Sequence, residues 1–174
     1  MQPPNRADLP YRPCVGIMLL NASGLVWLGR RKPKWMGDDH AAAWQLPTDG
    51  MWQMPQGGIA PLEPPAQAAM RELEEETAVR TAQIVGEVPD WLTYDLPDEL
   101  LGVALKGRYR GQRQRWFAMR FSGTDAEINI AGRNGLKAEF DAWRWADMAD
   151  VPRLIVPFKR EIYQNVVSAF AHLA

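Results

Sequence analysis

The sequence has 174 residues, a hydrophobic content of 47%, a charged content of 24% and a formal net charge of −1. These values are typical of one globular domain with its own core, and the charge argues against a generally basic nucleic-acid coat. The single cysteine, Cys14, excludes an internal disulfide framework, and two distant histidines exclude a histidine-rich metal site. The N-terminal residues lack the apolar stretch of a signal peptide, and no apolar run approaches the ~20 residues of a membrane span. We therefore expect a cytoplasmic protein with no membrane partner.

The predicted elements interleave strands with two helices. Apolar, branched or alternating patterns predict strands at 14–20, 25–29, 84–96 (interrupted by Pro89), 112–121 and around 143–145. A helix is expected at 66–78, because two prolines precede it in positions that suit a first turn. A second helix at 157–173 has apolar residues at helical spacing. This order predicts an α/β (α+β) sandwich with a mixed sheet.

The first helix is strongly acidic. Five carboxylates and a single base, Arg71, lie between residues 63 and 76. On a helix Glu72, Glu75 and Glu76 share one face, where like charges destabilise an isolated helix by ~0.2–0.5 kcal/mol per pair. Hard divalent cations bound to carboxylate oxygens offset such repulsion. The alternative is a solvated helix face, which is the usual meaning of a charge run.

A wider pattern favours the metal site. From Gly57 the chain follows G-x5-E-x7-R-E-U-x-E-E-x-G-U, where U is a bulky apolar residue, except that Ala78 replaces the last glycine. This pattern resembles the Nudix box of hydrolases that act on a nucleoside diphosphate linked to another group. The resemblance implies a Nudix-type α/β/α sandwich. A left-handed residue is expected at position 78, where alanine costs on the order of 1 kcal/mol relative to glycine.

The resemblance also implies roles for the box residues. Glu72, Glu75 and Glu76 would be metal ligands, and one of the last two would orient or deprotonate the attacking water. The implied ions are Mg²⁺ or Mn²⁺, with more than one per site. Cleavage of a pyrophosphate needs neutralised oxygens and a hydroxide, and bound metals supply both. Structural support of the site is implied for Gly57, Gly58, Glu63 and Arg71, the last two as an ion pair.

Ordered matches outside the box extend over about residues 11–170. Segments such as 52–59, 111–117 and 156–160 are similar to bacterial RNA 5′-pyrophosphohydrolases, which are also described as dinucleoside polyphosphate hydrolases. This resemblance implies removal of phosphate or pyrophosphate from the 5′ end of RNA, a step in mRNA decay. By position, Glu139 resembles a further metal carboxylate. Substrate contacts are implied for Arg12, Arg31, Tyr94, Phe158 and Lys159.

Several of these outer residues have a structural alternative. A lone glutamate such as Glu139 is usually a surface acid, and aromatic residues such as Tyr94 and Phe158 usually pack in a core. Lys159 is equally compatible with a solvated surface position. These alternatives stay open at the level of the sequence.

Residues 106–120 contain six basic side chains and no acid. On a strand, Arg113 and Arg115 face one way, while the neighbouring glutamines face the other. A basic strand beside an acidic metal helix suits a phosphate chain, so we expect both arginines to contact the substrate. A charged edge that protects the sheet is the alternative.

Two other functions remain open. The same machinery suits a dinucleoside polyphosphate such as diadenosine tetraphosphate. A catalytically silent nucleotide-binding Nudix module is less favoured, because every box glutamate is present.

An extension at 32–51 interrupts the single domain of residues 1–174. Long loops in small domains are often lids or binding loops, and this one carries two tryptophans, Trp35 and Trp44. We expect it to form a lid or a subunit contact near the substrate mouth. Deletion of residues 37–49 is then expected to change substrate affinity or oligomeric state.

Overall fold

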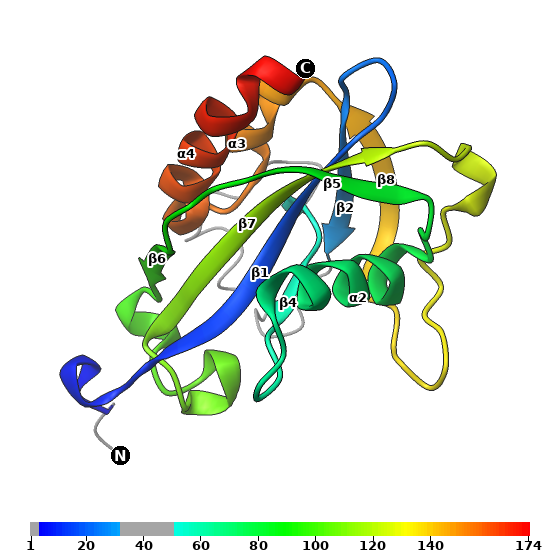
Figure 1. Ribbon diagram of the computed structural model, residues 1–174. Coiled ribbons are helices and arrows are strands. Elements are labelled where there is room, and N and C mark those ends of the chain that lie inside the picture. Colours follow the sequence, from blue (N-terminus) through cyan, green and yellow to red (C-terminus); the bar gives the residue numbers. More distant parts are fainter. Residues whose placement is uncertain (1–3, 32–50) are drawn as a thin grey trace.

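The computed structural model describes residues 4–31 and 51–174, so nearly all of the predicted extension lies outside the described residues. The described residues form an eight-stranded mixed sheet with helices on both faces (Figure 1). The strands are β1 (Tyr11–Leu20), β2 (Val26–Arg31), β3 (Met51–Gln53), β4 (Gln56–Gly58), β5 (Ala82–Glu87), β6 (Leu92–Asp95), β7 (Gly111–Phe121) and β8 (Phe140–Ala146). The α-helices are α2 (Pro65–Thr77), α3 (Val151–Leu154) and α4 (Arg160–Phe170). Short 3₁₀ helices occupy Arg6–Asp8, Asp98–Leu100, Ala104–Gly107, Asp125–Glu127, Met148–Asp150, Pro157–Lys159 and Ala171–Leu173.

The sheet is built around the parallel pair β1 and β7, which stay in register from Tyr11 to Leu20 of β1. The strand order is β3-β2-β1-β7-β5, with β4 paired to β1, β6 to β7 and β8 to β2. Two strands pair with the other edge of β1. Strand β4 pairs with Cys14–Gly16, and β2 pairs with β1 only at Leu20. Strand β4, which contains the first box residue Gly57, therefore lies next to β1.

Both faces of the central strands are buried, in two separate clusters. Val15, Ile17 and Leu19 of β1 pack with Leu73 of α2 on one face. The intervening residues, among them Met18, pack on the other face with α3 and α4. Because successive side chains of a strand point to opposite faces, this alternation produces two helix-covered layers. The predicted α/β/α sandwich with a mixed sheet is confirmed.

Helix α2 begins at Pro65, whose missing N–H would have no partner in a first turn. The helix ends at Ala78, which adopts φ 64° and ψ 2° and donates its N–H to the carbonyl of Glu74 at 2.8 Å. The left-handed residue predicted from the departure in the box is therefore present at this position. Ala78 is 7% exposed, so its methyl group is also packed.

Helix α4 closes the second face with the apolar stripe expected from the sequence. Tyr163 is central to it: its ring meets Trp116 edge-on at 5.5 Å, and its hydroxyl accepts the N–H of Met54 at 3.0 Å. The Trp116 ring lies directly over Gly16, where a Cβ atom would come within 2.5 Å of the indole. Among the residues that the structure describes, no helix is long and apolar enough to cross a membrane.

Candidate active site

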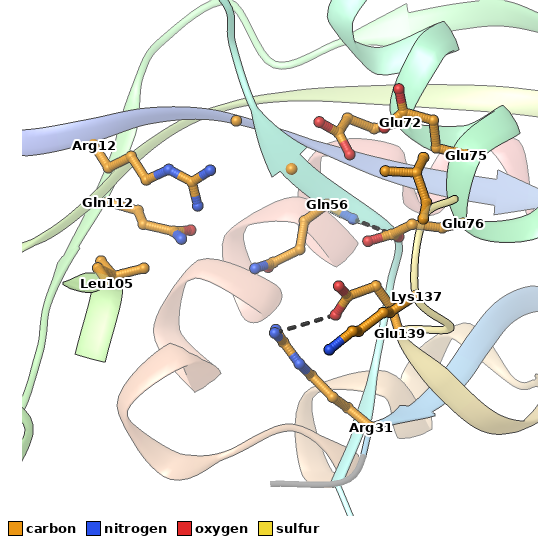
Figure 2. Close-up of a pocket in the computed structure, with 13 residues that line it drawn as sticks. Arg12, Arg31, Gln56, Glu72, Glu75, Glu76, Leu105, Gln112, Lys137 and Glu139 are labelled. Carbon is orange, nitrogen blue, oxygen red and sulfur yellow. Dashed lines mark hydrogen bonds and ion pairs between the residues drawn. The ribbon is translucent and has the colours of Figure 1, made fainter. Parts of the chain in front are cut away.

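A cavity of about 260 Å³ opens where β4 and α2 meet the first residues of β1 and β7 (Figure 2). Its lining residues are Arg12, Arg31, Gln56, Gly57, Gly58, Glu72, Glu75, Glu76, Leu105, Gln112, Leu136, Lys137 and Glu139. In Figure 2 the three α2 glutamates lie on one side, opposite Arg12, Gln112 and Leu105. The structure thus brings all four predicted metal carboxylates into one cavity.

Arg71 holds the carboxylates of this region together. Its Nε and Nη2 atoms donate to the two oxygens of Glu63 at 2.8 and 2.9 Å, which is the ion pair implied by the box. Its Nη1 atom reaches Glu72 at 2.7 Å and Glu75 at 3.3 Å, and Nη2 also donates to the Gly58 carbonyl at 2.9 Å. The hydrogen bonds from Arg71, followed by one from the Ala60 N–H, lower the pKa of Glu63 to about 2.

Two glycines let charged groups approach the backbone closely. A Cβ atom on Gly57 would lie 1.9 Å from the carboxyl carbon of Glu72, and one on Gly58 would lie 2.5 Å from Nη2 of Arg12. These separations are far shorter than any non-bonded contact between heavy atoms. Glycine is therefore required at both positions for Glu72 and Arg12 to keep their places.

Glu76 lines the cavity and is only partly exposed. Its Oε2 atom accepts the N–H of Gln56 at 3.2 Å. Burial raises the pKa of Glu76 well above its ordinary value, and the nearby charges of Glu72 and Glu139 raise it further. Burial also raises the pKa of Glu72. The cavity therefore concentrates negative charge that the surrounding side chains only partly neutralise.

The donor set fits a hard divalent cation. Within the described residues, no three metal-ligating side chains already converge as a preformed cluster, and guanidinium groups hold several of the carboxylates. Arg71 holds Glu72 and Glu75, and Arg31 lies 3.2 Å from an oxygen of Glu139. Carboxylate oxygens are the ligands that Mg²⁺ prefers. A cation bound here would offset the burial and the like charges that together raise the pKa of Glu76.

The predicted substrate contacts divide into two groups. Arg12 and Arg31 line the cavity, whereas Tyr94, Phe158 and Lys159 are absent from its lining and pack together instead. The Tyr94 and Phe158 ring centroids are 5.6 Å apart, and Nζ of Lys159 is 5.4 Å from the Tyr94 centroid. Tyr94 belongs to the buried core, which was the structural alternative to a substrate contact. Burial raises the pKa of its hydroxyl group.

Lys159 is 8% exposed, which excludes the solvated surface lysine that the sequence left open. Burial first, and then the charge of Arg31, lower the pKa of its ammonium group to about 7. The ammonium group therefore lies close enough to Arg31 to feel its charge and faces the Tyr94 ring.

The structure does not bring Arg113 and Arg115 to the cavity. They point to the opposite face of β7 from Gln112, as strand alternation predicts, and it is Gln112 that lines the cavity. Their guanidinium carbons lie 4.7 and 5.7 Å from the ring centroid of Trp91, and Arg115 also pairs with Glu87 at 2.9 Å. The alternation was predicted correctly, but the face that borders the cavity was not.

The comparisons with known proteins agree with this geometry. The sequence matches the NUDIX domain family over residues 10–166. The chain belongs to the NUDIX domain family. The four carboxylates, the Glu63–Arg71 ion pair and the two close-packed glycines are thus features of a NUDIX domain.

Close relatives of this NUDIX domain carry one name. The chain is 56% identical over 171 residues to a protein of Mesorhizobium japonicum named RNA pyrophosphohydrolase, covering 98% of this chain and 95% of the relative. It is 57% identical over 168 residues to an RNA pyrophosphohydrolase of Brucella abortus, covering 96% and 91%.

Solved structures of NUDIX-like fold are similar at lower identity. A Caenorhabditis elegans Ap4A hydrolase in a binary complex matches with a TM-score of 0.60 and 16% identity, over 92% of this chain and 98% of that one. The Escherichia coli dihydroneopterin triphosphate pyrophosphohydrolase matches with a TM-score of 0.59 and 17% identity, over 91% and 98%. At these identities the likeness shows the fold alone.

Several cavity residues of the NUDIX domain received no substrate role from the sequence. Gln112 is the register partner of Arg12, so only the pairing of β1 with β7 places it there. Leu105, Leu136 and Lys137 come from connecting segments with no periodic pattern. For Gln56 a signal did exist, because it stands directly before the first box glycine.

Proposed function

We propose that this NUDIX domain is a divalent-metal-dependent pyrophosphohydrolase that acts on 5′-triphosphorylated or 5′-diphosphorylated RNA and leaves a 5′-monophosphate. The observation that carries the proposal is the meeting of four carboxylates with two arginines in one cavity. The relatives named RNA pyrophosphohydrolase support the choice of substrate, since more than half of the aligned positions are identical over nearly the whole chain.

In this proposal Glu72, Glu75, Glu76 and Glu139 hold Mg²⁺ or Mn²⁺, with more than one ion in the site. Bound cations would neutralise phosphate oxygens and favour deprotonation of water near neutral pH. Glu75 and Glu76 are the two candidates to orient the attacking water or accept its proton. Both side chains are partly exposed and line the cavity, so either can reach a bound water.

Arg12 and Arg31 would hold the phosphate chain on either side of the carboxylates. A guanidinium group binds phosphate through two parallel hydrogen bonds and stays charged at any physiological pH. Arg12 has a fixed position against Gly58, and Arg31 is held by Glu139. Tyr94, Phe158 and Lys159 would act from behind this cavity, next to Arg31, as a support for the bound nucleotide.

The decisive experiment compares two substrates in the presence of magnesium. We expect kcat/KM for 5′-triphosphorylated RNA to exceed that for diadenosine tetraphosphate by at least tenfold, which corresponds to ~1.4 kcal/mol of transition-state preference. A preference for the dinucleotide would instead identify a dinucleoside polyphosphate hydrolase. Turnover of neither substrate by the metal-loaded protein would indicate a silent nucleotide-binding module.

Three earlier expectations stay predictions. The organisation as one domain of residues 1–174 with an extension at 32–51 depends on residues outside those described. A lid or subunit contact formed by that extension is likewise outside them. A cytoplasmic location and a step in mRNA decay follow from the proposed activity and need measurements in cells.

A further inference from the structure

A second cavity adjoins the carboxylate cavity. Its volume is about 130 Å³, and its lining residues are Arg12, Leu105, Lys106, Arg108 and Tyr109. Arg12 and Leu105 line both cavities, so these two side chains form the boundary between them. A phosphate chain held at the carboxylates needs only to pass Arg12 to enter the second cavity.

The second cavity is basic throughout. Three of its five lining residues are cations, and none is acidic. Within the part of the chain that the structure describes, no salt bridge joins Arg12, Lys106 or Arg108 to a carboxylate. The Arg108 guanidinium lies 5.7 Å from the centroid of the Tyr109 ring. Arg12 also feels the charge of Glu72 in the first cavity, but Lys106 and Arg108 form no salt bridge with an acid. The like charges of this cavity repel one another, and a bound anion would offset that repulsion.

The backbone that carries these cations is strained. Leu105 has φ 53° and ψ 35°, and Lys106 has φ 59° and ψ 25°, so two consecutive residues other than glycine are left-handed. Each such residue costs roughly 1–2 kcal/mol, and strained positions of this kind cluster at ligand sites. The unusual turn places Leu105 at the boundary of both cavities and Lys106 in the second one.

We propose that the second cavity is a phosphate subsite, in which Lys106 and Arg108 bind a phosphate group of the substrate that lies outside the cleaved bond. The inference rests on the proposed function, because it takes the substrate to be a 5′-polyphosphorylated RNA. Two phosphates have the required chemistry: the terminal phosphate of the 5′ chain, and a backbone phosphate of the following nucleotides. Arg12 connects the subsite to the carboxylates in either case.

The test uses the double variant Lys106→Gly/Arg108→Gln in the full chain. Glycine adopts the left-handed backbone of residue 106 without strain, so the substitution removes the ammonium group and keeps the turn. Arg153→Ala is the matched control, because Arg153 is an exposed arginine that lines neither cavity. We expect kcat/KM for triphosphorylated RNA to fall ~ten- to hundredfold in the double variant, as for lost hydrogen bonds to a charged group. The control variant retains the wild-type value.

The two phosphate sources are separated by varying the substrate. A loss that is larger for triphosphorylated than for diphosphorylated RNA, and equal for two-nucleotide and ten-nucleotide chains, assigns the subsite to the terminal phosphate. A loss confined to the longer chain assigns it to a backbone phosphate. No loss, or a loss that is the same for every substrate, overturns the subsite.

A binding measurement keeps this inference distinct from the proposed function. Inorganic tripolyphosphate is titrated calorimetrically into metal-free protein, where no hydrolysis is required. We expect the double variant to bind it at least tenfold more weakly than the wild type and the Arg153→Ala protein. This result would support the subsite even if the wild type failed to hydrolyse RNA. Hydrolysis of RNA by the wild type, with unchanged kcat/KM and unchanged tripolyphosphate binding in the double variant, would overturn the subsite and leave the proposed function intact.

Discussion

Glu76 is a cavity carboxylate whose charged form is disfavoured by its surroundings. Its carboxylate is partly buried, lies close enough to Glu72 and Glu139 to feel their charges, and accepts the Gln56 N–H. A buried charge with like-charged neighbours destabilises the fold. A glutamate that destabilises the fold in this way is expected at a catalytic position, where activity and not stability determines which amino acid is retained.

We predict that Glu76→Gln reduces hydrolysis by at least ~10², because it removes a charged group from the reacting region. In the absence of metal the same variant is expected to be more stable than the wild type at pH 7, because it removes a charge that burial and the neighbouring carboxylates disfavour. Steady-state kinetics and urea denaturation measure the two effects. Glu74→Gln is the control, because Glu74 is on the same helix, pairs with Arg80 and does not line the carboxylate cavity. Unchanged turnover in Glu76→Gln would refute the role of this carboxylate.

Glu63 has the opposite electrostatic situation. Its hydrogen bonds to Arg71 and to the Ala60 N–H lower its pKa from an ordinary 4.5 to about 2. A depressed pKa means that the stabilisation is fully present above pH ~4.5 and is lost as the pH falls through about 2. We predict that Glu63→Gln is less stable than the wild type at pH 6 and that this difference shrinks between pH 4.5 and 2. Urea denaturation at several pH values measures it, and a difference that does not vary with pH would contradict the ion-pair interpretation.

At the scale of elements, the end of α2 combines two conflicting requirements. Ala78 terminates the helix in a left-handed conformation and is packed against its surroundings. Glycine is favoured by the first requirement and alanine by the second. The cavity glutamates Glu72, Glu75 and Glu76 lie two to six residues earlier, within the helix, so a change at residue 78 is expected to leave their side chains in place.

We predict that Ala78→Gly stabilises the protein by up to ~1 kcal/mol, because glycine adopts φ 64° without the penalty of a Cβ atom. The same change at Ala66, which lies within the regular first turns of α2, is expected to destabilise it by ~0.5–1 kcal/mol. Thermal or urea denaturation of both variants tests the sign. Destabilisation by both substitutions would mean that burial of the Ala78 methyl group outweighs the backbone strain.

Much of this element structure was predictable, and the exceptions have physical causes. The patterns at 14–20, 112–121 and 66–78 correspond to β1, β7 and α2, because their periodicity extends over several turns or alternations. The expected strand at 84–96 is two strands, β5 and β6, separated around Pro89. Strands β3 and β4 were not predicted, because three residues are too few for a periodic signal.

The site residues could be predicted from the sequence only where they lie close together along the chain. The box spacing located Glu72, Glu75 and Glu76 on one helix face and paired Glu63 with Arg71. The neighbourhood of Gln112 and Lys137 depends on how distant strands pair, which no local pattern encodes. The position of Arg113 and Arg115 away from the cavity could not be predicted for the same reason, since alternation fixes two faces of a strand but not which one borders the cavity. Their contact with the substrate stays a prediction.

At the scale of the whole molecule, the cavity is an assembly of segments that are far apart along the chain. Arg12 comes from β1, Arg31 from β2, the glutamates from α2, and Glu139 from the residue before β8. A group that binds all of these at once links helix α2 to β1, to β2 and to the segment before β8 (Figures 1 and 2). Its binding is therefore expected to affect the stability of the fold as a whole.

We predict that Mg²⁺ stabilises the folded protein, by ~2.7 kcal/mol when its concentration is a hundred times its dissociation constant. The cation would neutralise the charges of Glu72, Glu76 and Glu139; burial, and after it the charges of the other two carboxylates, raises the pKa of Glu76. Protons compete for the same buried carboxylate, so the stabilisation is expected to weaken as the pH falls from 8 to 5. Thermal denaturation with Mg²⁺, at ionic strength matched with NaCl, measures it. A melting temperature that responds equally to both salts would mean that these four carboxylates do not form a divalent-cation site, because simple screening does not distinguish the two ions.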